Sequence, residues 1–325
     1  MSVLIYAENA DGKFKKSIFE AVSYARAIAD QQNTTLTAIS IGDVNADELN
    51  SLAKYGADKI LNVSNAQLKN FVNQAYASVI AEAAKKEGAD IVVLSNSFSG
   101  RGLAPRIGVK LDAGLVDGAV ELPELNGGKF TVKKTAFSGK AFAVVELTSA
   151  NKVIALTPNS YKIVEAAKTA KVEDFNVETK ESDFKAMLKE IVRSTDKVSL
   201  PDAEIVVSGG RGLKGPENWG MIEELASLLG AATACSKPVS DSGWRPHSEH
   251  VGQTGIAVSP NLYIAIGISS AIQHLAGVSS SKVIVVINKD AEAPFFKVAD
   301  YGIVGDAFEV VPKLIAAIKE HKALV

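Results

Sequence analysis

The sequence predicts an α/β protein made of two doubly wound domains. Short apolar, strand-like segments alternate with segments of helical periodicity from the N-terminus onward. The alternation stops in a polar stretch, Lys168–Val198, and resumes after it. A chain of 325 residues also exceeds the usual size of one domain, so its length favours about two. We therefore expect one α/β domain over residues 1–198 and a second over residues 199–325.

The first half predicts a parallel sheet with helices on its faces. Strands and helices follow one another in βαβα order, and such an order requires crossover connections between parallel strands. The expected elements are strands Val3–Ala7, Leu36–Ile41, Ile60–Val63 and Ile91–Leu94, with helices Phe14–Ala29, Ala46–Tyr55 and Ala66–Glu87.

The section Val116–Leu156 has a different pattern, which predicts antiparallel strands joined by glycine-containing turns. These strands are Phe130–Thr135, Ala141–Glu146 and Val153–Leu156, and the turns are Gly127-Gly128 and Ser138-Gly139. The polar stretch that follows contains one amphipathic segment, Phe184–Val192, which we expect to be helical. We place the domain boundary near Ser199-Leu200-Pro201.

The second half returns to alternation and predicts another parallel sheet. Its expected strands are Glu204–Val207, Ala231–Cys235, Leu262–Ile266, Val283–Ile287 and Gly302–Val304, and its expected helices are Pro216–Leu229, Ala271–Leu275 and Ala307–Glu320. The segment Val251–Ser281 contains no Asp, Glu, Lys or Arg, but prolines, glycines and polar residues interrupt it every few positions. We interpret it as buried sheet and loops, and expect no membrane insertion.

Composition limits the partners of the chain. With 35 basic and 37 acidic residues the net charge is −2, which argues against nucleic acid, because a polyanion usually requires a basic face. The single cysteine, Cys235, fits a reducing compartment. The apolar run Val3–Ala7 is too short for the core of a signal peptide, so we expect a cytoplasmic protein.

The residues after each strand of the second half predict a phosphate-bearing ligand, since doubly wound sheets bind ligands at the carboxyl ends of their strands. Small, polar or cationic residues follow all five strands: Ser208-Gly209-Gly210-Arg211-Gly212, Ser236-Lys237, Gly267-Ile268-Ser269-Ser270, Asn288 and Asp306. Glycines, helix N-termini and cations all favour phosphate. Any one such loop is explained by the needs of a turn. The coincidence of five such loops favours a phosphate-bearing ligand.

Two shorter motifs point to other ligands and are incomplete. Gly210-x-Gly212-x-x-Gly215 has the form of a dinucleotide fingerprint, but the acidic residue that should end the next strand is absent. Ser208-Gly209-Gly210 resembles the loop of ATP pyrophosphatases, although the next residues do not continue that motif. A stand-alone NAD- or ATP-binding enzyme is therefore the less favoured alternative.

Metal or hydrolytic chemistry has little support. His247, His250 and Asp241 are loosely spaced, and a solvated loop explains them better than a metal site. No order of Ser, His and Asp suggests a hydrolase. We expect neither a metal nor a catalytic residue.

A longer signature resembles a known family. Leu262–Gly277, read as LYIAIGISSAIQHLAG, and Asn288-Lys289-Asp290 resemble the FAD-binding signature of electron-transfer flavoprotein alpha subunits. The segments Val251–Gly255, Ser208–Lys214 and Ala299–Val304 resemble that family too, in the same order, so the specific match covers Glu204–Pro312. The resemblance implies a flavodoxin-like FAD-binding domain over residues 199–325. It also implies a nucleotide-binding-like N-terminal domain that docks a beta subunit.

The resemblance also implies a role for each matching residue. Arg211, Ser236 and the turn Ser269–Gln273 would hold the pyrophosphate and ribityl chain of FAD, while Gln253 and Thr254 would face the isoalloxazine, with the Thr254 hydroxyl near N5. His274 would lie near its O2/N1 edge, and Asn288 and Asp306 would hold the adenosine end. The implied cofactor contacts are Arg211, Ser236, Lys237, Val251, Gly252, Gln253, Thr254, Ser269, Ser270, Ala271, Ile272, Gln273, His274, Asn288 and Asp306.

Three residues depart from the family pattern. Ser270 stands where the family usually has glycine, so its side chain either crowds the cofactor or adds a hydroxyl contact. Lys237 stands where arginine is expected near the flavin, and a lysine supplies a point charge without the planar fork. Ile256 replaces a common lysine, which we expect to be harmless.

The implied function is that of an electron carrier and not of a self-contained catalyst. In such a heterodimer, FAD carries electrons from flavin dehydrogenases, such as the acyl-CoA dehydrogenases of fatty acid oxidation, to a quinone-linked oxidoreductase. An alternative within the family is a subunit of a flavin-bifurcating complex that uses NADH and reduces ferredoxin. The beta subunit's sequence would decide between them, because the second nucleotide site is not on this chain.

Overall fold

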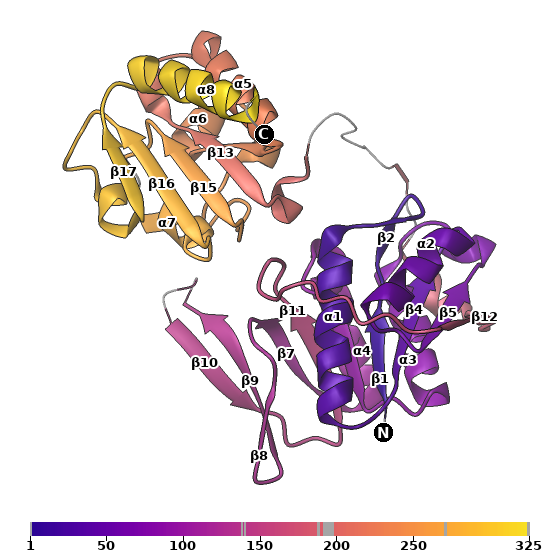
Figure 1. Cartoon of the computed structure of the whole chain (residues 1–325). Coiled ribbons are helices and arrows are strands. Elements are labelled where there is room, and N and C mark those ends of the chain that lie inside the picture. The colour runs from indigo at the N-terminus through magenta and orange to yellow at the C-terminus, as the bar shows by residue number, and fades with distance from the viewer. Residues whose placement is uncertain are drawn as a thin grey trace. The chain divides into compact units, whose positions relative to one another are not determined.

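The computed structural model describes residues 2–137, 139, 141–186, 189–190, 198–269 and 272–323. Contacts within the chain divide it into two compact units (Figure 1). The first unit comprises Met1–Ala136 and Phe142–Val192, and the second comprises Phe137–Ala141 and Arg193–Val325. Each unit is built on its own β-sheet with helices on the faces, which confirms the predicted α/β class with two sheets. In the described part of the chain, no helix has the length and apolarity that crossing a membrane requires.

The first unit contains a ten-stranded sheet in the order β10-β9-β7-β11-β6-β1-β4-β5-β12, with β8 paired to β9. Its strands are β1 Val3–Tyr6, β4 Leu36–Ile41, β5 Lys59–Val63, β6 Ile91–Ser95, β7 Ala113–Ala119, β8 Glu124–Asn126, β9 Lys129–Ala136, β10 Ala141–Glu146, β11 Asn151–Leu156 and β12 Lys171–Asp174. The strands from β12 to β7 are parallel, whereas β9 runs antiparallel to β7 and β8. A separate antiparallel pair joins β2 Asn9–Ala10 to β3 Lys13–Phe14.

Helices cover both faces of this sheet, so β1 is buried on both sides. Val3 and Ile5 pack against apolar residues of α1, and Leu4 and Tyr6 pack against those of α3 and α4. The α-helices of the first unit are α1 Lys16–Gln31, α2 Ala46–Ser51, α3 Asn73–Lys86 and α4 Phe98–Leu111, and its 3-10 turns are η1 Leu52–Tyr55, η2 Ala66–Leu68 and η3 Glu181–Phe184.

Several predicted elements of the first unit were wrong in detail. Val153–Leu156 belongs to β11, which lies between β6 and β7 and is parallel to both, so its predicted antiparallel direction was wrong. The predicted helix Ala66–Glu87 is interrupted between η2 and α3. The polar stretch Lys168–Val198 contains a strand, β12, at the sheet edge. Of the predicted helix Phe184–Val192, residues 187–188 and 191–192 lie outside the described residues.

The second unit contains a five-stranded, wholly parallel sheet in the order β14-β13-β15-β16-β17. Its strands are β13 Ile205–Gly209, β14 Ala232–Cys235, β15 Leu262–Ile266, β16 Val283–Asn288 and β17 Tyr301–Val304. Counted along the chain this order is 2-1-3-4-5, the flavodoxin-like order. The direction of winding reverses between β13 and β15, and doubly wound sheets bind their ligands at that point.

Helices lie on both faces of this sheet (Figure 1), and an apolar layer packs against each face. Val207 and Ile266 face the layer that contains α5 and α8, whereas Val206 and Ala265 face the layer that contains α7 and Phe295. The α-helices of the second unit are α5 Gly220–Leu229, α6 Lys237–Asp241, α7 Ile272–Val278 and α8 Ala307–Ala323. Its 3-10 turns are η4 Leu200–Asp202, η5 Arg211–Leu213, η6 Pro216–Asn218, η7 His247–Glu249 and η8 Pro294–Val298.

Candidate functional site

The loops after β13 and β15 lie in direct contact at the point where the winding reverses. The Gly210 amide donates to the Ile266 carbonyl at 2.9 Å, and the Gly212 amide donates to the Gly267 carbonyl at 3.0 Å. A Cβ on Gly210 would lie 2.2 Å from the Gly267 oxygen, and one on Gly212 would lie 2.7 Å from the Gly267 Cα. The glycines therefore allow one loop to approach the other, a role that the sequence analysis had assigned to the approach of a ligand.

A second pair of loops meets beside them. The segment Val251–Gly255 is tied to the start of α7, where the Gln253 amide donates to the Gln273 carbonyl at 2.7 Å. It is tied to the end of β14 as well, because the Val251 amide donates to the Cys235 carbonyl at 3.1 Å. Segments far apart in sequence are thereby gathered at the carboxyl ends of the strands.

The predicted site residues divide into an exposed and a buried set. The exposed side chains are Arg211, Lys237, Gln253, Thr254, Ser269, Ile272 and Gln273. Ser236, Val251, Gly252, His274 and Asn288 are buried, and Asp306 is partly buried. Ser270 and Ala271 lie outside the described residues. Polar and cationic groups thus face solvent above a buried layer that contains one histidine.

The cations differ in how strongly other groups hold them. Among the described residues Arg211 makes no ion pair, whereas Lys237 lies 3.2 Å from Asp241 on the next turn of α6. Lys214 lies 4.0 Å from Asp306 and above the ring of Phe308. Arg211 is therefore the cation best able to pair with an incoming phosphate.

Asn288 and Asp306 already have structural roles. Asn288, which ends β16, accepts a hydrogen bond from the Asp290 amide through Oδ1 at 3.1 Å. Asp306 accepts one from the Phe308 amide at 2.9 Å in the first turn of α8. Each side chain also has a further polar atom, which leaves it able to contact a ligand.

His274 lies in the buried layer and is neutral at working pH. Its Nε2 is 2.9 Å from the hydroxyl of Tyr263, a fully buried residue of β15. Burial lowers the pKa of His274 to about 4, the nearby Val251 backbone opposes that shift, and the charge of His250 adds to it. Tyr263 lies in the family signature Leu262–Gly277, but the resemblance implied no role for it, and nothing in the spacing of Tyr263 and His274 indicates that they touch.

In the second unit, three buried side-chain atoms of the described residues lack a hydrogen-bond partner. They are Nδ1 of His274, Oγ of Ser208 near the end of β13, and Nε1 of Trp219. Buried polar atoms without partners are rare, and a missing ligand is one of the ordinary reasons for them. Together with the exposed cations at the reversal point, they fit a flavin nucleotide, in which phosphate groups are linked to a ring system that bears carbonyl oxygens.

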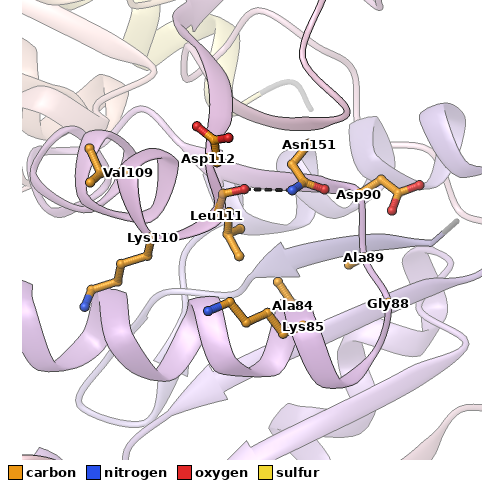
Figure 2. Close-up of a pocket in the computed structure, with 10 residues that line it drawn as sticks. All are labelled: Ala84, Lys85, Gly88, Ala89, Asp90, Val109, Lys110, Leu111, Asp112 and Asn151. Carbon is orange, nitrogen blue, oxygen red and sulfur yellow. Dashed lines mark hydrogen bonds between the residues drawn. The ribbon is translucent and has the colours of Figure 1, made fainter.

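Within the described residues, one pocket of the first unit and the pair His247 and His250 do not form a competing site. A pocket of about 450 Å³ lies at the amino ends of β6, β7 and β11, where Asn151 donates to the Leu111 carbonyl at 2.7 Å (Figure 2). Ligands of doubly wound sheets bind at the opposite, carboxyl edge. His247 is hydrogen-bonded to Ser240 at 2.9 Å, and within the described residues no cluster of three or more His, Cys, Asp or Glu is placed to hold a metal.

Comparison with known proteins gives matches over both units. The family model described as electron transfer flavoprotein domain matches residues 3–180, and that described as electron transfer flavoprotein FAD-binding domain matches residues 199–279. The electron transfer flavoprotein subunit alpha of Thermoanaerobacterium thermosaccharolyticum is 39% identical over 325 residues, with 98% of each chain covered. That of Bacillus subtilis is 37% identical over 321 residues, covering 98% of this chain and 97% of its own.

A relative with a different name matches the chain over a similar length. The acryloyl-CoA reductase electron transfer subunit beta of Anaerotignum propionicum is 33% identical over 352 residues, covering 98% of this chain and 96% of its own. These matches run from one end of the sequence to the other, and the FAD-binding match includes the loops that meet at the reversal point. The chain belongs to the family of electron transfer flavoprotein alpha subunits.

Proposed function

We propose that this chain binds FAD at the carboxyl edge of the second sheet and carries electrons between protein partners. The observation that supports this most directly is the gathering of Arg211, the Gln253-Thr254 loop and His274 at the reversal point. These residues come from three separate segments, which backbone hydrogen bonds hold at the carboxyl edge of the sheet. A bound flavin supplies reversible uptake and release of electrons.

The residues of the chain would hold and orient the cofactor. Arg211 and the turn Ser269–Gln273 would contact the pyrophosphate and ribityl chain, with Ser236 and Lys237 beside them. Gln253 and Thr254 would meet the isoalloxazine, with Val251 and Gly252 placing their loop. The imidazole of His274 would face the O2/N1 edge as a neutral group, because its burial disfavours the charged form. Asn288 and Asp306 would contact the adenosine end.

Partner proteins complete the proposal. Residues 1–198 would dock an electron-transfer flavoprotein beta subunit, and residues 199–325 would carry the FAD. Flavin dehydrogenases would donate electrons, and a quinone-linked oxidoreductase would accept them. Acyl-CoA chemistry in a partner protein is supported by the relative named for acryloyl-CoA reductase. We place the carrier in the cytoplasm, and its single cysteine fits a reducing compartment.

The test is to express the chain alone and together with a beta subunit, and to measure flavin content and mass. We expect a yellow heterodimer with flavin absorbance bands whose released cofactor is FAD, and a chain alone that is poorly soluble or loses FAD readily. An obligate interface buries roughly 2,000 Å² or more, which is enough to make the free subunit unstable. A colourless protein that cannot be reconstituted with FAD would refute the cofactor. A stable, fully flavinated monomer with turnover of its own would refute the carrier.

A further inference from the structure

Beneath the candidate site lies a buried cluster of three rings. The hydroxyl of Tyr263 is 2.9 Å from Nε2 of His274, and both side chains pack against Phe295. The ring centroids of His274 and Phe295 are 5.7 Å apart at an interplanar angle of 80°, an edge-on contact. Tyr263 and Phe295 are fully buried, and His274 is 6% exposed. The imidazole is therefore held in one orientation, with one nitrogen facing the phenol.

The direction of the bond between Tyr263 and His274 follows from their surroundings. Burial raises the pKa of the Tyr263 phenol well above its ordinary value, so the phenol keeps its proton at any working pH. That proton needs an acceptor, and Nε2 of His274 is the one within hydrogen-bond distance. The Ser208 hydroxyl is close enough to act against the raised pKa of Tyr263, but it does not reach hydrogen-bond geometry.

The surroundings of Nδ1, the other ring nitrogen of His274, favour the same direction of the hydrogen bond from Tyr263. Nδ1 of His274 has no partner within hydrogen-bond geometry, but the Val251 backbone lies near enough to raise the pKa of the ring. The Val251 amide is already bonded to the Cys235 carbonyl, so its free group is the carbonyl, which can only accept. A proton on Nδ1 suits this neighbour, whereas a lone pair would face a second lone pair.

We propose that Tyr263 is a positioning residue, which donates its phenolic proton to Nε2 of His274 and so fixes the imidazole as a neutral ring that carries its proton on Nδ1. This inference deepens the proposed function, and its relevance to electron transfer rests on that function. The tautomer presents a donor to the acceptor atoms of a ligand, such as the carbonyl oxygens of a flavin ring. The opposite tautomer would present a lone pair to those same oxygens and repel them.

Few ionisable groups can disturb this arrangement. Around His274 these are Tyr263 from β15 and His250 from the loop before Val251, and around Tyr263 there is also Cys235 from β14. Burial lowers the pKa of His250 and raises that of Cys235 to about 12, so both groups are uncharged near pH 7. The tautomer is therefore set by the hydrogen bond and not by a neighbouring ion.

The experiment is nitrogen-15 NMR of the histidine rings in the full chain, which has only four histidines. The ring signals of His274 are identified by their loss in His274→Gln. For the wild type we expect a neutral ring from pH 7 down to pH 5, with Nδ1 protonated. In Tyr263→Phe we expect the ratio of the Nδ1–H to the Nε2–H tautomer to fall about fivefold, the factor for losing one hydrogen bond of about 1 kcal/mol.

The control is Tyr301→Phe, which removes an exposed hydroxyl from β17 of the same unit and should leave the ratio unchanged. An unchanged ratio in Tyr263→Phe, or a wild-type ring that is protonated on Nε2 or charged at pH 7, would overturn the proposal. The wild-type result decides even if Tyr263→Phe fails to fold. Adding FAD together with a beta subunit separates the two proposals. A chain that keeps the tautomer but binds no flavin even with its partner refutes the proposed function and leaves the role of Tyr263 intact.

Discussion

The two sheets of this protein share a doubly wound architecture but differ in the charge that follows their strands. In the first unit, Glu8 lies just beyond β1 and Asp43 just beyond β4. In the second unit the corresponding positions hold Arg211 beyond β13 and Lys237 beyond β14. Since phosphate needs positive charge, the same fold supports an anion site in one unit and disfavours it in the other.

The polar groups of the two edges are also used differently. In the first unit, Ser97 donates to Glu8 at 2.6 Å and caps α4 by accepting from the Gly100 amide at 3.0 Å. Asn9 donates to Ser40 and to the Ile41 carbonyl. In the second unit Arg211 makes no ion pair among the described residues. The comparison indicates that loops, and not sheet order, decide which edge serves as a site.

The largest expected effect comes from filling the contact between the two loops of the second unit. A Cβ on Gly210 would lie 2.2 Å from a backbone oxygen, so Gly210→Ala should cost about 3 kcal/mol of unfolding free energy. Both tryptophans, Trp219 and Trp244, lie in this unit, so their fluorescence in urea reports its unfolding. Gly220→Ala, where no atom lies within 4 Å, should stay within about 0.5 kcal/mol of wild type. Equal effects of the two substitutions would contradict the close packing.

Removing charge tests the difference between the edges directly. Arg211→Ala should weaken FAD binding to the deflavinated protein about 10- to 150-fold, equivalent to ~1.5–3 kcal/mol, because a charged phosphate contact is lost. Arg101→Ala removes an exposed arginine from α4 of the first unit and should leave the affinity unchanged. Titration with FAD measures both. Similar affinities in the two variants would remove Arg211 from the phosphate site.

Acid should weaken the second unit through His274. The ring takes up a proton with an ordinary pKa of about 6.5 in the unfolded chain but only near 4 when folded. The contribution of His274 to the free energy of unfolding is therefore fully present above pH 6.5. It falls as the pH drops towards 4, by about 2 kcal/mol between pH 7 and pH 5. Buried His250 acts with the same sign.

Tryptophan fluorescence in urea at the two pH values measures this loss, and His274→Gln should reduce it. His321→Gln, near the end of α8, should not. Identical pH dependence in wild type and His274→Gln would show that the ring is accessible to protons in the folded state.

The smallest expected effect lies in the first unit. Ser97→Ala removes the cap of α4 and should cost about 1 kcal/mol. The far-ultraviolet circular dichroism transition should move while the tryptophan transition and the FAD content stay unchanged. Ser99→Ala changes a serine two residues further along, within the first turn of the same helix, and should shift neither the circular dichroism transition nor the FAD content. A loss of FAD in Ser97→Ala would mean that the first edge takes part in cofactor binding.

Strands of the core were the most predictable elements. Leu262–Ile266 is a continuous apolar run, and Leu36–Ile41 is interrupted only by the small polar residues Thr37 and Ser40. The structure has both strands with the predicted bounds. The direction of β11 was not predictable, because a buried strand has the same apolar pattern whether its neighbours are parallel or antiparallel. Helix α4 was missed, since Gly100, Gly102, Pro105 and Gly108 lower its helix propensity and packing of Leu103 and Ile107 overrides it.

The candidate site was predictable as a set of loops but not as a set of contacts. Strand ends identify the residues that meet at one edge, because parallel strands bring their carboxyl ends together. Packing between the loops depends on backbone approach, which glycine content alone does not specify. The contact of Tyr263 with His274 depends on how α7 crosses the sheet, and no local pattern encodes that angle.

Cys235 gives the protein a practical property for spectroscopy. The only thiol of the chain is fully buried, and burial raises its pKa to about 12, so at neutral pH it stays protonated and unreactive. Maleimide dyes and spin labels attack the thiolate, so they should leave the native chain unmodified. A cysteine introduced at an exposed position such as Gln253 would then be labelled alone, and would report distances from the carboxyl edge of the second sheet without removal of the natural thiol.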